Sequence, residues 1–246
     1  MLILVSNDDG VYSPGIRALA KALKQIGEVW IVAPDRERSA ASHSLTIHRP
    51  LRIQKISPQV YAVDGTPTDS VNLGINVLLK KKPDLVVSGI NKGANMADDV
   101  HYSGTVSAAV EACLMGVPAI AISQIFGKRF LFNPAARFAV KLAKKVLKEG
   151  LPRGMVLNVN VPNVHEKEIN GFEWVKLGKR NYGEALIEKL DPRGRPYYWV
   201  GGDQSGFVNI PGSDCNAIHE NKITITPLQI DMTDHAAIKE FKNWKI

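Results

Sequence analysis

The sequence predicts an α/β fold: a Rossmann-like, mostly parallel sheet with helices on both faces, followed by a C-terminal extension rich in β-hairpins. Two observations carry this prediction. Across residues 1–130, short apolar runs alternate with helical patterns, as in βαβ units. From about residue 165, aromatic and glycine-rich segments replace that alternation. We expect one domain over residues 1–246, with a core of about residues 1–164 and an extension of about residues 165–246.

The expected strands are apolar runs of the length that a buried strand requires. The first follows Met1 directly and gives way to polar residues at Ser6 and Asn7. Most of the later runs follow a helical pattern, which is the order that makes neighbouring strands parallel. In chain order, the expected strands cover residues 2–5, 29–33, 60–63, 85–87, 119–122, 155–161 and 223–226.

The expected helices have apolar residues at helical spacing, and most begin at a recognisable signal. Ser13 as N-cap and Pro14 at N1 open the first helix, and Gly27 ends it. A proline near the start also marks two later helices, at Pro67 and Pro134. The expected ranges are 13–27, 66–79, 104–115 and 133–148, with a last helix from Thr233 that buries Ala237, Ile238 and Phe241.

The extension is expected to fold as hairpins rather than as crossover units. Its clearest segment is Pro196-Tyr-Tyr-Trp-Val-Gly-Gly, in which aromatic residues precede two glycines. We find no internal repeat and no low-complexity linker, so a second domain is not expected.

The composition narrows the class of protein. The formal net charge of +7 favours anionic ligands, either phosphorylated metabolites or nucleic acid. We expect no membrane span and no signal peptide, because the first apolar run is short and stops at Ser6. The two cysteines, Cys113 in a helical pattern and Cys215 in a polar loop, form no metal-binding or disulfide framework. A cytoplasmic location is therefore expected.

Polar residues follow three of the predicted strands, at the sheet edge where α/β proteins bind ligands. They are residues 7–9 after the first strand, residues 35–39 after the second and residues 88–95 after the fourth. A single strand end with an aspartate would be an ordinary helix cap. Three polar strand ends at one edge indicate a binding site.

Two adjacent acids occupy the first turn between strand and helix, where a dinucleotide-binding protein would have glycines. Asp8 and Asp9 repel each other and would repel a phosphate group, so they require basic partners, raised pKa values or a cation. A divalent ion such as Mg²⁺, Mn²⁺ or Ca²⁺ resolves this conflict, since these ions prefer oxygen ligands. The neighbouring strand ends add the Ser39 hydroxyl and the Asn91 amide oxygen as candidate ligands.

These candidate ligands leave coordination positions for water and for a phosphate oxygen, which is typical of a catalytic metal site. An ion there polarises a phosphoryl group and lowers the pKa of a bound water. Ser103, Gly104 and Thr105 precede a helical pattern and offer hydroxyl and backbone N–H donors to an anion. A plain helix cap is the other interpretation of this triplet.

The motifs resemble those of the SurE family, the survival protein family of metal-dependent 5′(3′)-nucleotidases. The matches are dense in the first half of the chain and sparser but ordered afterwards. The matching segments are ILVSNDDG (3–10), APDRERSA (33–40) with His43 and Ser44, GTP (65–67), VSGIN (87–91), YSGTV (102–106), NVNVP (158–162) and TITPL (224–228) with Asp231. One departure is Ala94, where the family usually has proline, so this loop is expected to be less rigid.

The resemblance implies a Rossmann-like core with a β-hairpin extension, and hydrolysis of nucleoside 5′- or 3′-monophosphates and of short polyphosphate. It implies one divalent ion per subunit and a homodimer or homotetramer formed by exchange of C-terminal segments. The implied metal ligands are Asp8, Asp9, Ser39 and Asn91, and the implied phosphate contacts are Asn95, Ser103, Gly104 and Thr105.

Three hypotheses follow for the function. The first is an enzyme in which Asp8 or Asp9 orients the attacking water, with the general acid unassigned. The second is a non-catalytic, cation-dependent sensor of nucleotide or polyphosphate. The third is a basic nucleic-acid binder, which is not expected because the sequence has no recognisable recognition helix or aromatic RNA platform. His43 and His101 flank the polar loops and are further candidates for acid chemistry.

Overall fold

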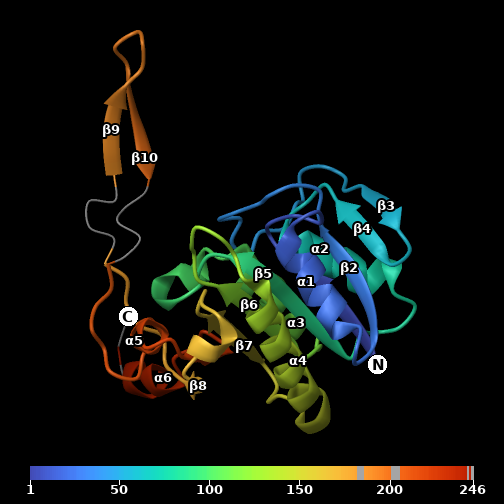
Figure 1. Ribbon diagram of the computed structural model, residues 1–246. Coiled ribbons are helices and arrows are strands. Elements are labelled where there is room, and N and C mark those ends of the chain that lie inside the picture. The colour runs from blue at the N-terminus through green and yellow to red at the C-terminus, as the bar shows by residue number, and fades with distance from the viewer. Residues whose placement is uncertain (182–185, 201–205, 243, 245–246) are drawn as a thin grey trace.

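The computed structural model describes residues 1–181, 186–200, 206–242 and 244 (Figure 1). A nine-stranded sheet has the order β3-β4-β2-β1-β5-β6-β7-β11-β8, and β9 and β10 form a separate hairpin. The strands are β1 Leu2–Ser6, β2 Glu28–Pro34, β3 Ile53–Ser57, β4 Val60–Val63, β5 Leu85–Lys92, β6 Ala119–Gln124, β7 Met155–Val161, β8 Phe172–Trp174, β9 Leu186–Leu190, β10 Pro196–Val200 and β11 Ile223–Gln229. The α-helices are α1 Pro14–Leu23, α2 Pro67–Leu73, α3 Gly104–Leu114, α4 Phe132–Glu149, α5 Asp214–His219 and α6 His235–Phe241.

The centre of the sheet is parallel, which confirms the predicted fold class. Strands β4, β2, β1, β5, β6 and β7 pair in parallel, whereas β11 is antiparallel to β7 and β3 is antiparallel to β4. The chain moves from β1 to β2 on one side, and β5 pairs with β1 on the other. The strand order therefore reverses between β1 and β5, and ligands bind at such a reversal in open α/β sheets.

Helices cover both faces of the sheet (Figure 1). Successive strand residues point to opposite faces, so Ile3 and Val5 pack in the cluster that contains side chains of α1 and α4. Leu2 and Leu4 pack in the cluster that contains side chains of α2 and α3. All five residues of β1 are buried, which explains the uninterrupted apolar run in the sequence.

Several element boundaries differ from the sequence prediction. Strand β5 continues to Lys92, so residues 88–92, which we expected in a loop, lie in the sheet. Helix α1 ends at Leu23 rather than near Gly27, and a π-helical turn, η1, follows α2 over Gly74–Leu78. The strands β3, β8 and β9 and helix α5 were not predicted, because they are short and lack a clear apolar period.

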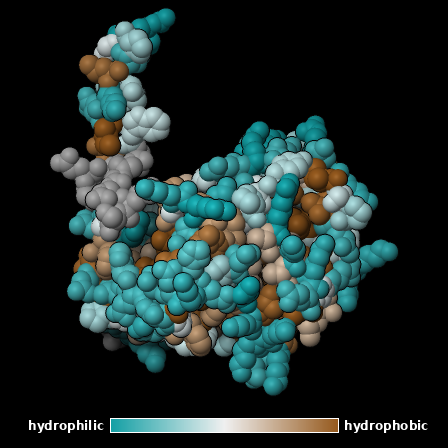
Figure 2. Space-filling view, viewed as in Figure 1, coloured by the Kyte–Doolittle hydropathy of each residue, from teal (hydrophilic) through white to brown (hydrophobic). Residues whose placement is uncertain are grey.

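The extension contains the expected hairpin, and its tight turn lies between β9 and β10. Asp191 Oδ1 accepts hydrogen bonds from the N–H groups of Arg193 and Arg195, at 2.8 and 2.9 Å, and so fixes this turn. The glycine pair of the predicted segment, residues 201–202, lies outside the described residues. The hairpin stands away from the core, with apolar and polar side chains mixed along it (Figure 2).

Two expectations about burial are wrong. The C-terminal helix α6 has no buried residue, with Ile238 45% and Phe241 49% exposed. It follows the end of β11, and Phe241 packs edge-on against Trp244. Cys215, expected in a polar loop, is buried in α5. Within the described part of the chain, no helix is long and apolar enough to cross a membrane.

Candidate functional site

Asp8 and Asp9 lie just beyond the end of β1, at the point where the strand order reverses. Asp8 is only 6% exposed, and its Oδ1 accepts a hydrogen bond from the hydroxyl of Thr105 at the start of α3. Asp9 is half-buried, and its Oδ2 accepts a hydrogen bond of 3.2 Å from the backbone N–H of Lys92. The two carboxylates therefore link the first strand to α3 and to the end of β5.

The environment of these acids disfavours their charged forms. Burial raises the pKa of Asp8 to about 6, the hydrogen bond from Thr105 opposes this shift, and the charge of Asp9 adds to it. Burial also raises the pKa of Asp9, against the lowering effect of nearby Lys92. A cation beside the pair would offset both effects, and the available donors are oxygens, so the site fits a hard divalent ion.

The loop after β2 packs tightly against the Asp8 turn. The Arg38 N–H donates a hydrogen bond of 2.7 Å to the carbonyl oxygen of Asp8. Gly10 has a φ of +92°, and a Cβ on it would lie 3.0 Å from the carbonyl carbon of Arg36. Only glycine accommodates both this conformation and this close contact. The packing brings the loop that carries Ser39 to the carboxylates.

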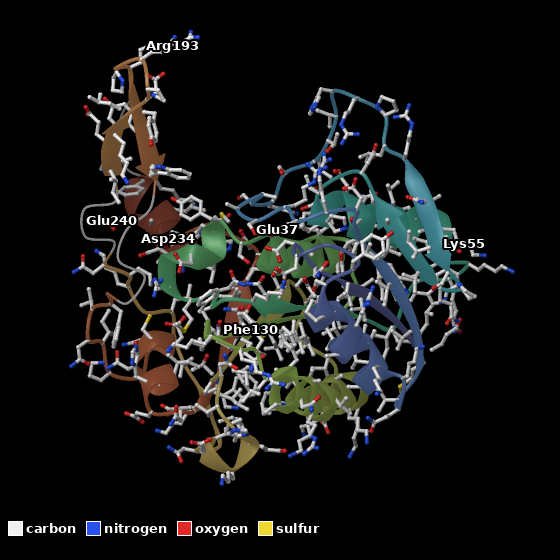
Figure 3. The ribbon with its side chains drawn as sticks, turned by 45° about the horizontal axis from the view of Figure 1, so that its top comes forward. Glu37, Lys55, Phe130, Arg193, Asp234 and Glu240 are labelled. Atoms are coloured by element: carbon white, nitrogen blue, oxygen red, sulfur yellow. The ribbon has the colours of Figure 1, made fainter. Side chains whose placement is uncertain are left out.

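Ser39 itself is exposed, and its hydroxyl donates a hydrogen bond of 2.7 Å to Glu37 Oε1. The charge of Glu37 also contributes to the raised pKa of Asp9. In the view of Figure 3, Glu37 lies near the centre of the picture, whereas Lys55 and Arg193 lie at its edges. The sequence did not single out Glu37, because an acid in a polar loop is usually a solvated surface residue.

Asn91 occupies the end of β5, next to the Asp9 contact at Lys92. Its Nδ2 donates a hydrogen bond of 3.0 Å to the carbonyl oxygen of Gly93, which leaves the amide oxygen as a candidate ligand. The pairing of β5 with β6 shifts register between Gly89 and Asn91. A Cβ on Gly89 would lie 2.2 Å from a backbone oxygen of β6, so the glycine is required here.

The start of α3 contains the helix cap that we considered for residues 103–105, and it also contacts Asp8. Ser103 is a helix N-cap, with its Oγ accepting a 3.0 Å hydrogen bond from the Val106 N–H. The Thr105 hydroxyl is used by Asp8. Gly104 and Thr105 contribute the first N–H groups of the helix, which point to the open end where anions bind. A Cβ on Gly104 would lie 2.8 Å from the Asp8 Cβ, so glycine permits this contact.

Asn95 is buried inside a group of polar side chains from β6 and β7. Its backbone N–H donates to Asn160 Oδ1 at 2.8 Å, and its carbonyl oxygen accepts from Asn158 and Asn160. Its side-chain amide donates a 2.7 Å hydrogen bond to Ser123 Oγ, which leaves one amide N–H for another partner. The alternation of Asn158 and Asn160 on an otherwise apolar strand was the sequence signal for this support.

His43 does not face the carboxylate pair. Its Nε2 lies 2.9 Å from Glu111 Oε2 on α3, and Asn72 donates to the other oxygen of Glu111. The hydrogen bond from His43 is the main reason that the pKa of Glu111 is lowered. His43 therefore anchors the loop after Ser39 to α3. His101 is exposed, and its carbonyl oxygen accepts a hydrogen bond from the Ser42 hydroxyl.

A separate cavity of about 510 Å³ lies between α4, β8 and β11, and none of the candidate residues lines it. Among the described residues, no three or more histidine, cysteine or acidic side chains converge as metal ligands. A cation at the Asp8 site would consequently depend on the hydroxyl and amide oxygens as well as on two carboxylates.

Comparisons with known proteins agree with this architecture. The model of the family described as "Survival protein SurE" matches residues 3–184. A protein of Geobacter sulfurreducens named 5′-nucleotidase SurE is 53% identical over 100% of this chain and 94% of its own length. A protein of Myxococcus xanthus with the same name is 51% identical over 99% of this chain and 93% of its own length.

The crystal structure of the SurE protein from Aquifex aeolicus superposes with a TM-score of 0.90. The two sequences are 44% identical, and the alignment covers 98% of each chain. Both the sequence and the fold are thus similar over nearly the whole length, and the chain belongs to the SurE family.

Proposed function

We propose that this chain is a divalent-metal-dependent phosphomonoesterase that hydrolyses nucleoside 5′-monophosphates to nucleoside and phosphate. One observation carries the proposal: the buried carboxylate of Asp8 contacts the N-terminal turn of α3 at the point where the strand order reverses. A carboxylate suited to a cation and a helix N-terminus suited to an anion thus lie side by side. The relatives named 5′-nucleotidase support the substrate class, and 3′-monophosphates and short polyphosphate are further candidate substrates.

In this proposal Asp8, Asp9, Ser39 and Asn91 hold one Mg²⁺, Mn²⁺ or Ca²⁺ ion per subunit. When bound, the ion supplies charge neutralisation at the phosphoryl group and lowers the pKa of a bound water.

The residues of the chain bind and orient the substrate. The first N–H groups of α3, from Gly104 and Thr105, face the phosphate oxygens, and Ser103 and Asn95 add side-chain donors. The hydroxyl of Thr105 holds the Asp8 carboxylate in a fixed orientation. Asp8 and Asp9 orient the attacking water.

The other proposals concern the whole molecule. We propose a single domain over residues 1–246, a cytoplasmic location, and a homodimer or homotetramer formed by exchange of C-terminal segments. The exposed apolar side of α6 and the exposed aromatic side chains Tyr198 and Trp199 of β10 support the exchange, because isolated apolar surface of this kind is usually covered. Sedimentation velocity of the full chain tests the assembly.

Hydrolysis of p-nitrophenyl phosphate and of adenosine 5′-monophosphate, with added Mn²⁺ and then with EDTA, tests the function. We expect activity that EDTA abolishes and that Asp8→Asn lowers at least about 100-fold. The matched control is Asp84→Asn. Asp84 Oδ2 accepts a hydrogen bond from the Leu2 N–H at the amino ends of β1 and β5, whereas Asp8 follows the carboxyl end of β1. Activity that survives both EDTA and Asp8→Asn contradicts the proposal, and metal-dependent nucleotide binding without turnover indicates a sensor.

A further inference from the structure

Asp214 is a fully buried carboxylate that joins the C-terminal extension to the core. It is 0% exposed. Its Oδ2 accepts a hydrogen bond of 2.9 Å from the Ala97 N–H, and its Oδ1 accepts hydrogen bonds of 2.7 Å from the N–H groups of Gly178 and Cys215. Burying a carboxylate is costly unless hydrogen bonds replace its water. Three backbone donors provide that replacement, two from distant segments and one from the next residue.

The Ala97 contact reaches the loop that carries the candidate phosphate contacts. We call residues 93–103 the phosphate loop. Ala97 begins the 3₁₀ helix η2, Ala97–His101, with a φ of +50°, a left-handed conformation that is uncommon outside glycine. Asn95 lies two residues before it, and η2 leads to Ser103. The carboxylate of Asp214 therefore fixes the backbone midway between the two groups that are proposed to hold the phosphate.

The Gly178 contact reaches the segment that leads into the hairpin. A Cβ on Gly178 would lie 2.9 Å from Asp214 Oδ1, so only glycine fits against this carboxylate. Two residues later, Arg180 forms a 3.1 Å ion pair with Asp99 of η2. Both side chains of this pair are mostly buried, where an ion pair is screened little by solvent. The extension thus contacts the phosphate loop at two places.

Apolar packing reinforces the same connection. Met96 and Ala97 of the phosphate loop form one buried cluster with Cys215 and Ile218 of α5. On its other side the loop is held by Asn158 and Asn160 of β7, through Asn95. The core strand β7 supports one half of the loop, and the C-terminal extension supports the other half.

We infer that Asp214 is a positioning residue for the phosphate loop, and that residues 176–180 and 213–219 of the extension form part of the hydrolytic site. The inference rests on the proposed function, because it assigns Asn95 and residues 103–105 to the phosphate. It predicts that loss of the Asp214 carboxylate weakens phosphate binding selectively. The proposed metal ligands lie outside this loop: Asp8 and Asp9 follow β1, Ser39 follows β2, and Asn91 lies in β5. The affinity for the ion is therefore expected to be preserved.

The test uses the full-length Asp214→Asn variant. The asparagine has nearly the same shape, but its amide nitrogen cannot accept a hydrogen bond from a backbone N–H. We expect inorganic phosphate to bind at least about tenfold more weakly by calorimetry in the presence of Mn²⁺, and KM for adenosine 5′-monophosphate to rise in parallel. The affinity for Mn²⁺ alone is expected to change less than about twofold. Asp84→Asn is the control, and both phosphate affinity and KM are expected to be unchanged in it.

Arg180→Met provides an independent measurement if Asp214→Asn does not fold. It removes the second contact between the extension and η2, and we expect a smaller loss of phosphate affinity with the same preservation of Mn²⁺ affinity. Unchanged phosphate affinity in the folded variants, or an equal loss of Mn²⁺ affinity, overturns the inference. Failure of the proposed function is distinguishable, because it would appear as absent turnover in the wild-type protein, whereas phosphate binding is measured without turnover.

Discussion

The hydroxyl of Thr105 donates a hydrogen bond to Oδ1 of Asp8. This contact joins the end of the first strand to the beginning of α3, across 97 positions of sequence. It also orients one carboxylate oxygen, and the other oxygen is available to a cation. Without a cation, the carboxylate is desolvated and lies beside a second acid. Its ionisation should therefore affect both metal binding and stability.

Binding of Mn²⁺ is expected to depend on the ionised form of Asp8. Because burial raises the pKa of Asp8 to about 6 in the metal-free protein, protons compete with the ion below that pH. We expect affinity to fall by about tenfold for each pH unit below 6, and Asp8→Asn to weaken binding at least about 100-fold at pH 7.5. Calorimetry between pH 5 and pH 8 measures both effects. An affinity that does not change with pH contradicts this assignment.

In the metal-free protein, the contribution of Asp8 to the free energy of unfolding should decrease as pH rises. A carboxylate with a lowered pKa has the opposite effect. The pKa of Asp8 is higher in the folded protein than its ordinary value of 3.8, so the folded state binds the proton more tightly. The contribution of Asp8 to stability is complete below pH 4 and is lost as pH rises through 6, by up to about 3 kcal/mol. In EDTA at pH 7, Asp8→Asn should therefore be more stable than the wild type.

Urea unfolding of both proteins at pH 7 and pH 4.5 measures this difference. The advantage of Asp8→Asn should shrink at the lower pH, where the carboxyl of the folded wild type is mostly protonated. Addition of Mn²⁺ at pH 7 should reverse the order, because only the wild type binds the ion tightly. An advantage of equal size at both pH values would argue against a titrating Asp8.

Gly104 is predicted to be intolerant of a side chain. A Cβ there would lie 2.8 Å from the Cβ of Asp8 and 3.1 Å from the side chain of Pro67, so α3 and the Asp8 turn must separate. We expect Gly104→Ala to cost about 1 to 3 kcal/mol of stability and to lower phosphatase activity at least about tenfold. Val110→Ala, further along the same helix, should reduce stability without a comparable loss of activity. Full activity in Gly104→Ala would show that this close contact is dispensable.

The core of the fold could be predicted because its strands and helices have a clear apolar period. The buried run of β1 and the N-terminal signals of α1 and α2 depend on neighbours within a few residues. The same patterns could not reveal what covers a helix. Helix α6 carries the apolar residues Ile238 and Phe241, yet both are about half exposed. An amphipathic pattern predicts that a helix has an apolar face, but it does not identify what packs against that face.

The candidate site was predictable where its residues follow strands. Asp8, Asp9 and Asn91 come at the ends of parallel strands, and parallel strands bring their carboxyl ends to one edge. The residues that hold the candidate phosphate contacts in place were not predictable in the same way. Asp214 contacts Ala97 from 117 positions away in sequence, and only the folded chain reveals that contact. The role of Asn158 and Asn160 was partly predictable, since two amides on an otherwise apolar strand indicate a buried polar partner.

The pair of His43 and Glu111 is expected to stabilise the loop after Ser39 rather than to transfer a proton. His43 Nε2 lies 2.9 Å from Glu111 Oε2, and this hydrogen bond is the main cause of the lowered pKa of Glu111. A lowered carboxyl pKa stabilises the fold above the ordinary value of 4.5, and this contribution is lost as pH falls through the lower folded value. His43→Ala should therefore cost about 1 to 2 kcal/mol at pH 7 and progressively less below pH 4.

Thermal or urea unfolding at pH 7 and below pH 4, together with kcat at pH 7, tests this role for His43. The matched control is His101→Ala, because the His101 side chain is exposed and only its backbone carbonyl contacts the same loop. That control should change stability by less than about 0.5 kcal/mol. We expect kcat of His43→Ala to fall no more than about threefold, since Glu111 holds the imidazole on α3. A 100-fold loss of kcat with unchanged stability would instead assign His43 to acid chemistry.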